Sequence, residues 1–154
     1  MTNGYDVQVG PSTAVPIASV RARVALDHIP DAFREPLGKV WAFLRTHPEL
    51  KKDAHNVFLY HHATFDNGVI DIDFGVQVVS AFPGEGEVAC TALPAGVAAS
   101  VVHRGPYDGL GAAHGAIHAW MKEHGCNSPL SWEIYGDWSE DPAKLETTVF
   151  YLLD

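Results

Sequence analysis

The sequence repeats one order of predicted elements, and this repeat constrains the fold more than any other feature. Alternating apolar residues predict a strand over Val15–Leu26, and apolar residues at helical spacing predict a helix between Pro30 and Pro48. Two strands follow, over Val57–His62 and Val69–Val79. The turn sequence Asp66-Asn67-Gly68 supplies the positive φ angles that join such strands into a hairpin.

The second half of the chain repeats the order strand, helix, strand, strand. Val97–Arg104 predicts the strand, and Leu110–His124 predicts a helix that Gly125 terminates. Ser131–Asp137 and Glu146–Leu153 predict the closing pair of strands. We therefore interpret residues 1–154 as one domain with internal repeats at roughly 13–80 and 94–154.

The segments outside the repeats are expected to be less regular. The chain starts with a short segment, Tyr5–Val9, and a turn at Gly10-Pro11-Ser12. Phe82–Leu93 is expected to be a loop with a short strand, because Pro83-Gly84-Glu85-Gly86 interrupts it.

Superposing the two repeats predicts which side chains share a face of the sheet. Phe58-Leu59-Tyr60 then match Glu133-Ile134-Tyr135. Alternation along the strands predicts that one set faces the helices: Val57, Leu59, Trp132 and Ile134. A second set is predicted to face away from the helices: Phe58, Tyr60, His62, Glu133 and Tyr135.

The composition excludes several classes of function. The formal net charge is −9, and no basic cluster exceeds Lys51-Lys52, so we expect no direct nucleic-acid binding. The acidic balance favours a cationic partner over an anionic one. No stretch approaches the roughly 18 apolar residues of a membrane span, and no signal peptide is recognisable. We therefore expect no membrane contact and a cytoplasmic location, which Cys90 and Cys126 fit because they lack disulfide or metal spacing.

Motifs for cofactors and metals are weak. Gly105–Gly111 lacks the P-loop ending and the dinucleotide spacing, so we expect no cofactor. His114 and His118 lie four residues apart on the predicted helix, and His55 and His61-His62 lie in the other half, but no third ligand can be assigned. We therefore expect no metal site and interpret the two helical histidines as part of a solvated flank.

Glu133 is the strongest candidate for a functional residue. It stands in the apolar and aromatic segment Trp132-Glu133-Ile134-Tyr135, where burial would remove its hydration without a basic neighbour in the strand. A cationic or hydrogen-bond-donating ligand between aromatic rings would compensate its charge, and the seam between two packed units is a common place for such a site. Two alternatives stay open: Glu133 points into solvent, or it pairs with Arg23 or Arg104.

Two further aromatic residues lie near this seam. Tyr107 follows the Gly105-Pro106 turn at the start of the second helix, where it either lines the site or only packs against the turn. Trp138 follows the Glu133 strand and would cap a pocket or cover a sheet edge.

Four motifs, in this order and spacing, resemble the GyrI-like family, which also forms the effector-binding domain of AraC-type and MerR-type multidrug regulators. They are Pro94-Ala95-Gly96, His103-x-Gly105-Pro106-Tyr107, Trp132-Glu133-Ile134-Tyr135 and Asp141-Pro142-x-x-Leu145-Glu146-Thr147. The resemblance covers essentially the whole chain. It implies an α+β fold with a pseudo-twofold, eight-stranded antiparallel sheet, two helices on one face and a ligand groove on the other.

The resemblance also implies a ligand. Glu133 matches the groove carboxylate that meets cationic, planar drugs in the multidrug-binding members, and Tyr107 and Tyr135 match aromatic positions beside it. Phe58 and Tyr60 join this set only through the superposition of the two repeats. We therefore expect a small, planar, hydrophobic ligand, cations included, bound by these residues: Glu133, Tyr135, Tyr107, Tyr60, Phe58 and Trp138.

The resemblance leaves two other functions open. Some stand-alone members look like hydrolases that open the cyclopropane ring of DNA-alkylating natural products, and there Glu133 would orient or deprotonate the attacking water. The third function is a protein-interaction module of the gyrase-inhibitor type, with a regulatory protein as partner. The chain starts a few residues before its first strand and shows no helix-turn-helix, so we do not expect it to read DNA unaided.

Overall fold

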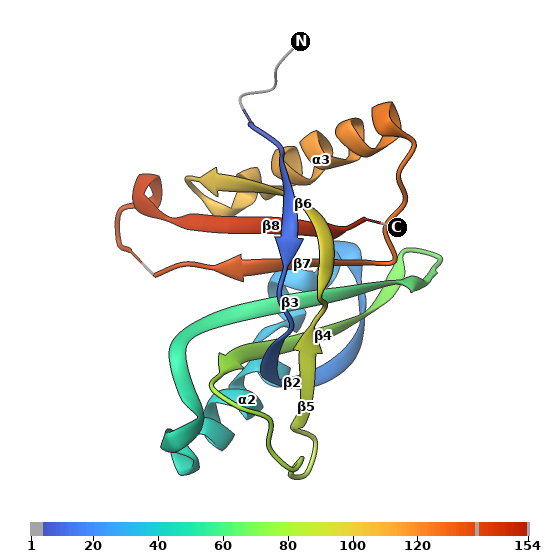
Figure 1. The fold of residues 1–154 in the computed structure, drawn as a ribbon. Coiled ribbons are helices and arrows are strands. Elements are labelled where there is room, and N and C mark those ends of the chain that lie inside the picture. The colour runs from blue at the N-terminus through green and yellow to red at the C-terminus, as the bar shows by residue number, and fades with distance from the viewer. Residues whose placement is uncertain (1–4, 138, 154) are drawn as a thin grey trace.

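The computed structural model describes residues 5–137 and 139–153 of the chain, and the side chains of all of these except 52–54. Eight antiparallel strands form one sheet in the order β1-β6-β8-β7-β3-β4-β2-β5 (Figure 1). The strands are β1 (Gln8–Ser12), β2 (Val15–Ala25), β3 (Lys51–Asp66), β4 (Val69–Val78), β5 (Ala89–Leu93), β6 (Gly96–Arg104), β7 (Leu130–Tyr135) and β8 (Glu146–Leu152). The helices are α1 (Ile29–Ala32), α2 (Arg34–Thr46) and α3 (Leu110–His124). The predicted α+β class is confirmed.

The two predicted repeats meet at the centre of the sheet, where β3 pairs with β7. The strand order reads the same from both edges when β2, β3, β4 and β5 are matched with β6, β7, β8 and β1. The register places Phe58 directly opposite Glu133. Each half therefore contributes the expected order of strand, helix, strand, strand, and an origin of the halves by duplication stays a prediction.

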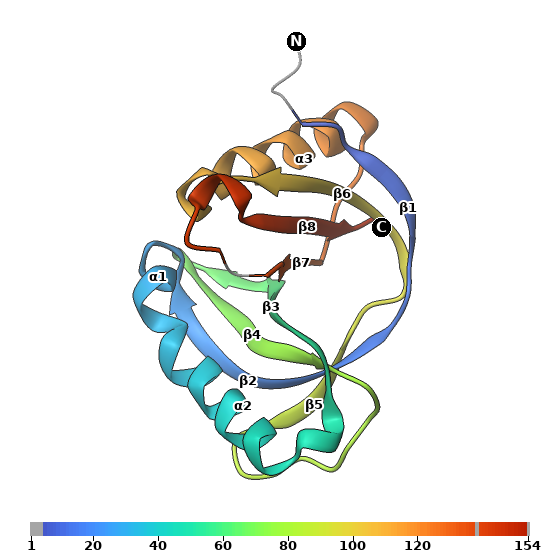
Figure 2. The same cartoon turned by 90° about the vertical axis from the view of Figure 1, so that its left-hand side faces the viewer.

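Both long helices cover the same face of the sheet, one over each half (Figure 2). Paired residues of an antiparallel sheet point to the same face, so each register defines a row of side chains. The central row on the helix-covered face consists of Val101, Val149, Glu133, Phe58, Phe74 and Val20. Glu133 is the one charged member of this row, and it lies between the parts of the sheet that α2 and α3 cover.

The prediction that Glu133 and its aromatic neighbours face away from the helices is wrong. Phe58 and Tyr60 pack in the same core as α2, and the apolar set predicted to face the helices forms a separate core on the opposite face: Val57, Leu59, Trp132 and Ile134. The sheet curls into a half-barrel, so both of its faces bury apolar side chains. Apolar character therefore could not distinguish the two faces, and the candidate site moves to the helix-covered face.

At the β1 edge of the sheet the structure differs from the prediction, whereas at the β5 edge it agrees with it. The turn predicted at Gly10-Pro11-Ser12 is wrong, because these residues belong to β1 and pair with β6. A proline fits there because β1 is an edge strand, on which an N–H can be missing without breaking the sheet. The hairpin turn is confirmed by the positive φ angles of Asn67 (51°) and Gly68 (78°), and β5 is the short strand expected within residues 82–93.

The first helical segment is split at Phe33 into α1 and α2. Pro36 has no backbone N–H to donate to the carbonyl four residues earlier, so the helical ladder is interrupted at this point. The next residue, Leu37, resumes the ladder by donating to the Phe33 carbonyl at 3.0 Å. Pro36 therefore makes the start of this helix irregular.

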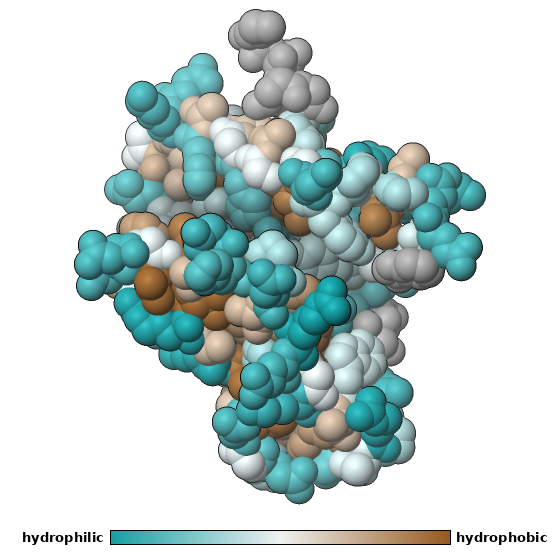
Figure 3. Space-filling model, turned by 180° about the vertical axis from the view of Figure 1, so that it is seen from behind, coloured by the Kyte–Doolittle hydropathy of each residue, from teal (hydrophilic) through white to brown (hydrophobic). Residues whose placement is uncertain are grey.

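The face shown in Figure 3 is mostly hydrophilic, with hydrophobic residues gathered at mid-height. The large hydrophobic residues exposed in the described part of the chain are Val9, Leu26, Phe65, Val79, Val97, Val102 and Tyr107. In that same part, no helix has the length and apolar character needed to cross a membrane.

A buried charge cluster lies on the helix-free face of the sheet. Asp73 is 1% exposed, accepts a hydrogen bond from Arg21 Nε at 2.7 Å and lies 2.8 Å from His61 Nε2. Burial alone raises the pKa of Asp73, but the hydrogen bonds from His61 and Arg21 outweigh it, so the net pKa is lowered. The ionised carboxylate is thus the form that the fold stabilises.

Replacing Asp73 with asparagine is expected to lower the free energy of unfolding by about 1–2 kcal/mol at pH 7, because the charged hydrogen bonds of the buried carboxylate are lost. The loss is not larger because its partner Arg21 is half exposed and screened by solvent. Since the folded-state pKa is below the unfolded one, the contribution of Asp73 is present above the unfolded pKa and is lost as pH falls through the folded pKa. The difference between wild type and Asp73→Asn in urea titrations should therefore be constant above about pH 5 and shrink below about pH 4.

The matched control for this prediction is Asp71→Asn. Asp71 pairs with Arg23 at 3.1 Å on the neighbouring register position, but both side chains are more exposed than Asp73. We expect its effect at pH 7 to stay below about 1 kcal/mol. An equal loss for the two variants would contradict a special contribution from the buried carboxylate.

Candidate functional site

Glu133 is 3% exposed, and three protein groups hold its carboxylate. Tyr60 and Tyr135 both donate from their phenol oxygens to Oε1, at 2.8 and 2.6 Å. His114 places Nε2 2.6 Å from Oε2. Two phenols and an imidazole therefore contact the buried carboxylate in place of water.

Both structural alternatives for Glu133 are wrong. The carboxylate is not exposed to solvent, and neither arginine considered from the sequence reaches it. Arg23 pairs with Asp71 at 3.1 Å, and Arg104 pairs with Glu146 at 3.3 Å. Within the described residues, His114 is the ion-pair partner of Glu133.

Three elements bring these groups together. Tyr135 lies two residues after Glu133 in β7, so alternation places both side chains on one face. Tyr60 comes from the neighbouring strand β3, where it pairs with Ser131. His114 comes from α3, which packs on β6 and β8 and thereby points this side chain back toward β7.

Both phenols that donate to Glu133 are held in their protonated form. Burial, followed by the negative charge of Glu133, raises the pKa of Tyr60 well above its usual value of 10.0. The same two causes, in the same order, raise the pKa of Tyr135 well above that value. Tyr60 and Tyr135 therefore remain hydrogen-bond donors to the carboxylate at any physiological pH.

Aromatic rings extend from the carboxylate toward the surface. Phe58 meets Tyr135 edge-on with ring centroids 4.9 Å apart, and Tyr107 also meets Tyr135 edge-on, with centroids 5.5 Å apart. Tyr107 is 41% exposed and belongs to the short 3-10 helix Tyr107–Gly109. The turn before it is held by His103, whose Nε2 donates to the Pro106 carbonyl at 2.8 Å.

Five of the six predicted ligand-binding residues thus lie together: Glu133, Tyr135, Tyr107, Tyr60 and Phe58. The sixth, Trp138, lies outside the described residues. These residues come from two strands, β3 and β7, and from the short 3-10 helix that precedes α3, and the position of Glu133 opposite Phe58 connects them across the seam between the halves.

His114 is the residue of this site that the sequence did not assign. The interpretation as a solvated flank is wrong for it, because its two ring nitrogens contact Glu133 and the phenol oxygen of Tyr151, the latter at 2.7 Å. Its spacing carried a signal: His114 is four residues after Leu110 and three before Ile117, both on the apolar face of the helix. A residue in that position faces the sheet, and the row beneath it contains the glutamate.

Further histidines surround this corner of the site. His62 Nε2 lies 2.6 Å from the hydroxyl of Ser131, and His118 meets Tyr151 edge-on at 5.0 Å. Burial, followed by repulsion from His118 and His114, lowers the pKa of His62. Burial and repulsion from His114 also lower the pKa of His118. Within the residues that the structure covers, no three metal-ligating side chains are arranged to hold an ion.

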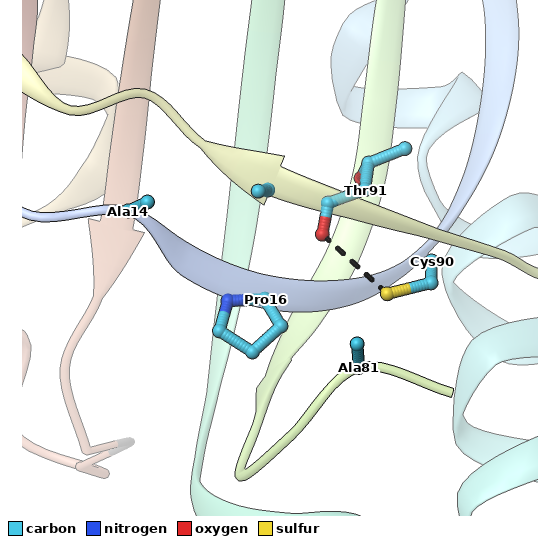
Figure 4. Close-up of a pocket in the computed structure, with 6 residues that line it drawn as sticks. Ala14, Pro16, Ala81, Cys90 and Thr91 are labelled. Atoms are coloured by element: carbon cyan, nitrogen blue, oxygen red, sulfur yellow. Dashed lines mark hydrogen bonds between the residues drawn. The ribbon is translucent and has the colours of Figure 1, made fainter.

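A surface pocket of about 460 Å³ lies elsewhere, between β2 and β5 (Figure 4). Its lining is small and uncharged: Ala14, Pro16, Ala81, Cys90, Thr91 and Ala92. Figure 4 shows the thiol of Cys90 directed at the Thr91 carbonyl, at 3.9 Å. This pocket contains none of the predicted site residues and offers no charged group, so it is not the candidate site.

The fold and the site define a class: a curled antiparallel sheet with two helices on one face and a buried carboxylate in the row between them. The chain belongs to the family described as the GyrI-like small molecule binding domain, whose model matches residues 6–152. The predicted family is confirmed. A comparison with curated proteins finds no match for this sequence.

Several solved structures share the fold. The C-terminal domain of EcmrR is 23% identical with a TM-score of 0.79, and the match covers 98% of each chain. SAV2435 bound to tetraphenylphosphonium is 11% identical with a TM-score of 0.74, over 97% of this chain and 94% of the other. A hydrolase from Listeria innocua, encoded by lin2189, is 11% identical with a TM-score of 0.64, over 96% and 91%. The match to EcmrR in its complex with DNA covers 97% of this chain but 57% of that one.

Proposed function

We propose that this chain binds small organic molecules that are planar and hydrophobic, cations included, at Glu133. The observation that carries the proposal is a carboxylate that is 3% exposed, stands in an apolar row of the sheet and has no lysine or arginine partner among the described residues. Burying a carboxylate lowers the stability of the folded protein relative to an apolar residue at the same position. A role in ligand recognition accounts for that cost.

The surroundings of Glu133 suit a flat cation. Phe58, Tyr60, Tyr107 and Tyr135 present aromatic rings around the carboxylate, and the electron-rich faces of such rings attract cations. The two tyrosines that donate to Oε1 fix the orientation of the acid, so the ligand would meet a carboxylate that is already positioned.

Access requires movement of side chains. Neither of two surface pockets in the described part of the chain is lined by Glu133. His114 contacts the carboxylate and Tyr107 contacts Tyr135, and both are more exposed than Glu133. We expect a ligand to enter between the start of α3 and β7 by displacing these two side chains, a local change typical of ligand-induced opening.

The family membership supports a small-molecule ligand, and one fold relative supports a hydrophobic, aromatic cation. SAV2435 is a similar structure bound to tetraphenylphosphonium, a bulky aromatic cation. The hydrolase alternative finds less support in the geometry of Glu133. A general base needs a lone pair aimed at the attacking water, whereas Glu133 already receives three protein contacts.

The test is an isothermal calorimetric titration of wild type and Glu133→Gln with tetraphenylphosphonium at pH 8. Glutamine keeps the shape of the side chain and removes the charge. We expect the affinity for the cation to fall roughly 10- to 100-fold, because the ligand loses its desolvated counter-ion.

Triphenylphosphine oxide serves as the neutral control ligand, and its affinity should change less than threefold in the same variant. Equal affinity of wild type and Glu133→Gln for tetraphenylphosphonium would remove the glutamate from cation recognition. Mass spectrometry of a cyclopropane-bearing alkylator incubated with the protein separates binding from hydrolysis, since only an enzyme adds water to more than one equivalent.

A further inference from the structure

His114 is placed between Glu133 and solvent. Its side chain is 21% exposed, whereas that of Glu133 is 4% exposed, and the two are joined by a contact of 2.6 Å. Tyr60, which is buried, and Tyr135, which is partly buried, both donate to the other carboxylate oxygen. His114 is therefore the partner of Oε2.

The hydrogen bonds of His114 determine which nitrogen carries a proton in the neutral ring. An ionised carboxylate oxygen only accepts, so Nε2 must donate to Glu133. Nδ1 is then bare and accepts the phenol proton of Tyr151, 2.7 Å away. Burial raises the pKa of Tyr151, which keeps this phenol protonated and able to donate.

A second proton on His114 changes the charge of the site without removing these contacts. Nδ1–H would then donate to the Tyr151 oxygen, and Nε2–H would still donate to Glu133. In the first state the buried pair has a net charge of minus one. In the second state the imidazolium neutralises it, so the site offers no uncompensated charge to a cation.

The other titratable groups around His114 come from three strands and from α3 itself. Tyr60 and His62 approach from β3, Glu133 from β7 and Tyr151 from β8, while His118 lies one turn further along α3. The tyrosines keep their protons and the pKa values of His62 and His118 are lowered, so both histidines favour the neutral form. Within the described residues, no lysine or arginine pairs with Glu133 and competes with His114.

We propose that His114 is a proton-dependent internal counter-ion of Glu133 that sets the charge preference of the site. With neutral His114 the site prefers cations, and with protonated His114 this preference is lost. The inference rests on the proposed ligand site and adds a residue and a direction of regulation to it. By linkage, binding of a permanent cation is coupled to loss of the proton from His114.

The experiment measures the affinity of tetraphenylphosphonium from pH 5.5 to pH 8.5, the range in which imidazoles titrate. This probe keeps its charge throughout, so any pH dependence arises from the protein. We expect the affinity of wild type for the cation to rise about tenfold or more with pH. The reason is that a neighbouring unit charge typically changes an equilibrium constant in a protein site by about tenfold or more. Triphenylphosphine oxide should show less than a threefold change over the same range.

Two variants assign the effect to one histidine. His114→Gln keeps an N–H donor for Glu133 but cannot take up a proton, so its affinity for the cation should be independent of pH. His118→Gln is the matched control, one helical turn away and beside the same Tyr151 ring, and it should keep the pH dependence of wild type. A pH-dependent affinity in His114→Gln, or a pH-independent one in wild type, would overturn the proposal.

A second measurement needs no ligand. Long-range ¹H–¹⁵N spectra of the imidazole report which ring nitrogen is protonated, and above pH 8 we expect His114 to carry its proton on Nε2. The Nδ1–H tautomer in wild type would contradict the inferred contact with Glu133. If the tautomer is as expected and tetraphenylphosphonium does not bind at pH 8.5, the proposed cation site fails and, with it, the role of His114 in charge preference; if the cation binds through Glu133 without pH dependence, only the present inference fails.

Discussion

Replacing Phe74 with alanine is expected to lower the free energy of unfolding by about 3–5 kcal/mol, the usual range for removing a fully buried phenylalanine. Phe74 is 0% exposed and lies in the central row of the helix-covered face, between Val20 and Phe58. Its ring meets that of Phe58 edge-on at 4.8 Å. The cavity left by alanine cannot collapse easily, because strands on both sides and α2 above hold its walls.

Removing the Phe74 ring should also disturb the packing of the ligand site. Phe58 lies between Phe74 and Tyr135, at 4.8 and 4.9 Å, so the wall beside Glu133 rests on the ring that is removed. Urea denaturation followed by tryptophan fluorescence measures the stability. Val79→Ala is the control on the same stretch of chain; Val79 is 53% exposed, and its change should stay within about 0.5 kcal/mol. A small loss for Phe74→Ala would show that the core on this face is loosely packed.

Replacing Gly75 with alanine is expected to lower the free energy of unfolding by about 2–3 kcal/mol, which is large for the addition of one methyl group. A Cβ at this position would lie 2.5 Å from the carbonyl oxygen of Ala18 and 3.0 Å from Cβ of Ser19. Ala18 and Ser19 belong to β2, which pairs with β4 at this point. The neighbouring backbone of β2 would have to move away from β4.

Gly115→Ala is the matched control for this second prediction. Gly115 lies in α3, and a Cβ there would meet no atom within 4 Å. Alanine should therefore stabilise the protein by about 0.5–1 kcal/mol through its higher helix propensity. Thermal unfolding of both variants should show shifts of opposite sign. A neutral Gly75→Ala would mean that β2 and β4 separate without cost.

Local patterns predicted most of the elements because their causes are local. Alternation and helical spacing located β2, β4, β6, β8 and α3, and Asn67-Gly68 located the hairpin turn through its positive φ angles. The prediction failed at Gly10-Pro11-Ser12, where residues typical of a turn form an edge strand instead. These residues form a strand because they pair with β6, and no nearby sequence pattern predicts this pairing.

The sequence predicted most of the residues of the candidate site but not their arrangement. Glu133 was identified because a carboxylate in an aromatic strand is unusual in any fold. Tyr60 was identified through the superposition of the two repeats, and Tyr107 and Tyr135 through the family resemblance. His114 was missed because its role depends on how α3 lies across the sheet, which the residues of α3 alone do not specify. The assignment of Glu133 to the helix-free face was wrong for a related reason, since Leu59 and Trp132 are as apolar as the residues under the helices.

The amino-acid sequence on its own determined the class of fold, the order of elements in the two halves and the presence of an acid that could not be left without partners. Those properties follow from periodicity, turn chemistry and the cost of dehydrating a charge, all of which act over a few residues. Only the tertiary structure decided which face the acid occupies and that His114, Tyr60 and Tyr135 hold it. The curl of the sheet buries both faces, and the packing of α3 on β6 and β8 directs His114 toward Glu133 of β7. Both are long-range consequences of packing that no single segment encodes.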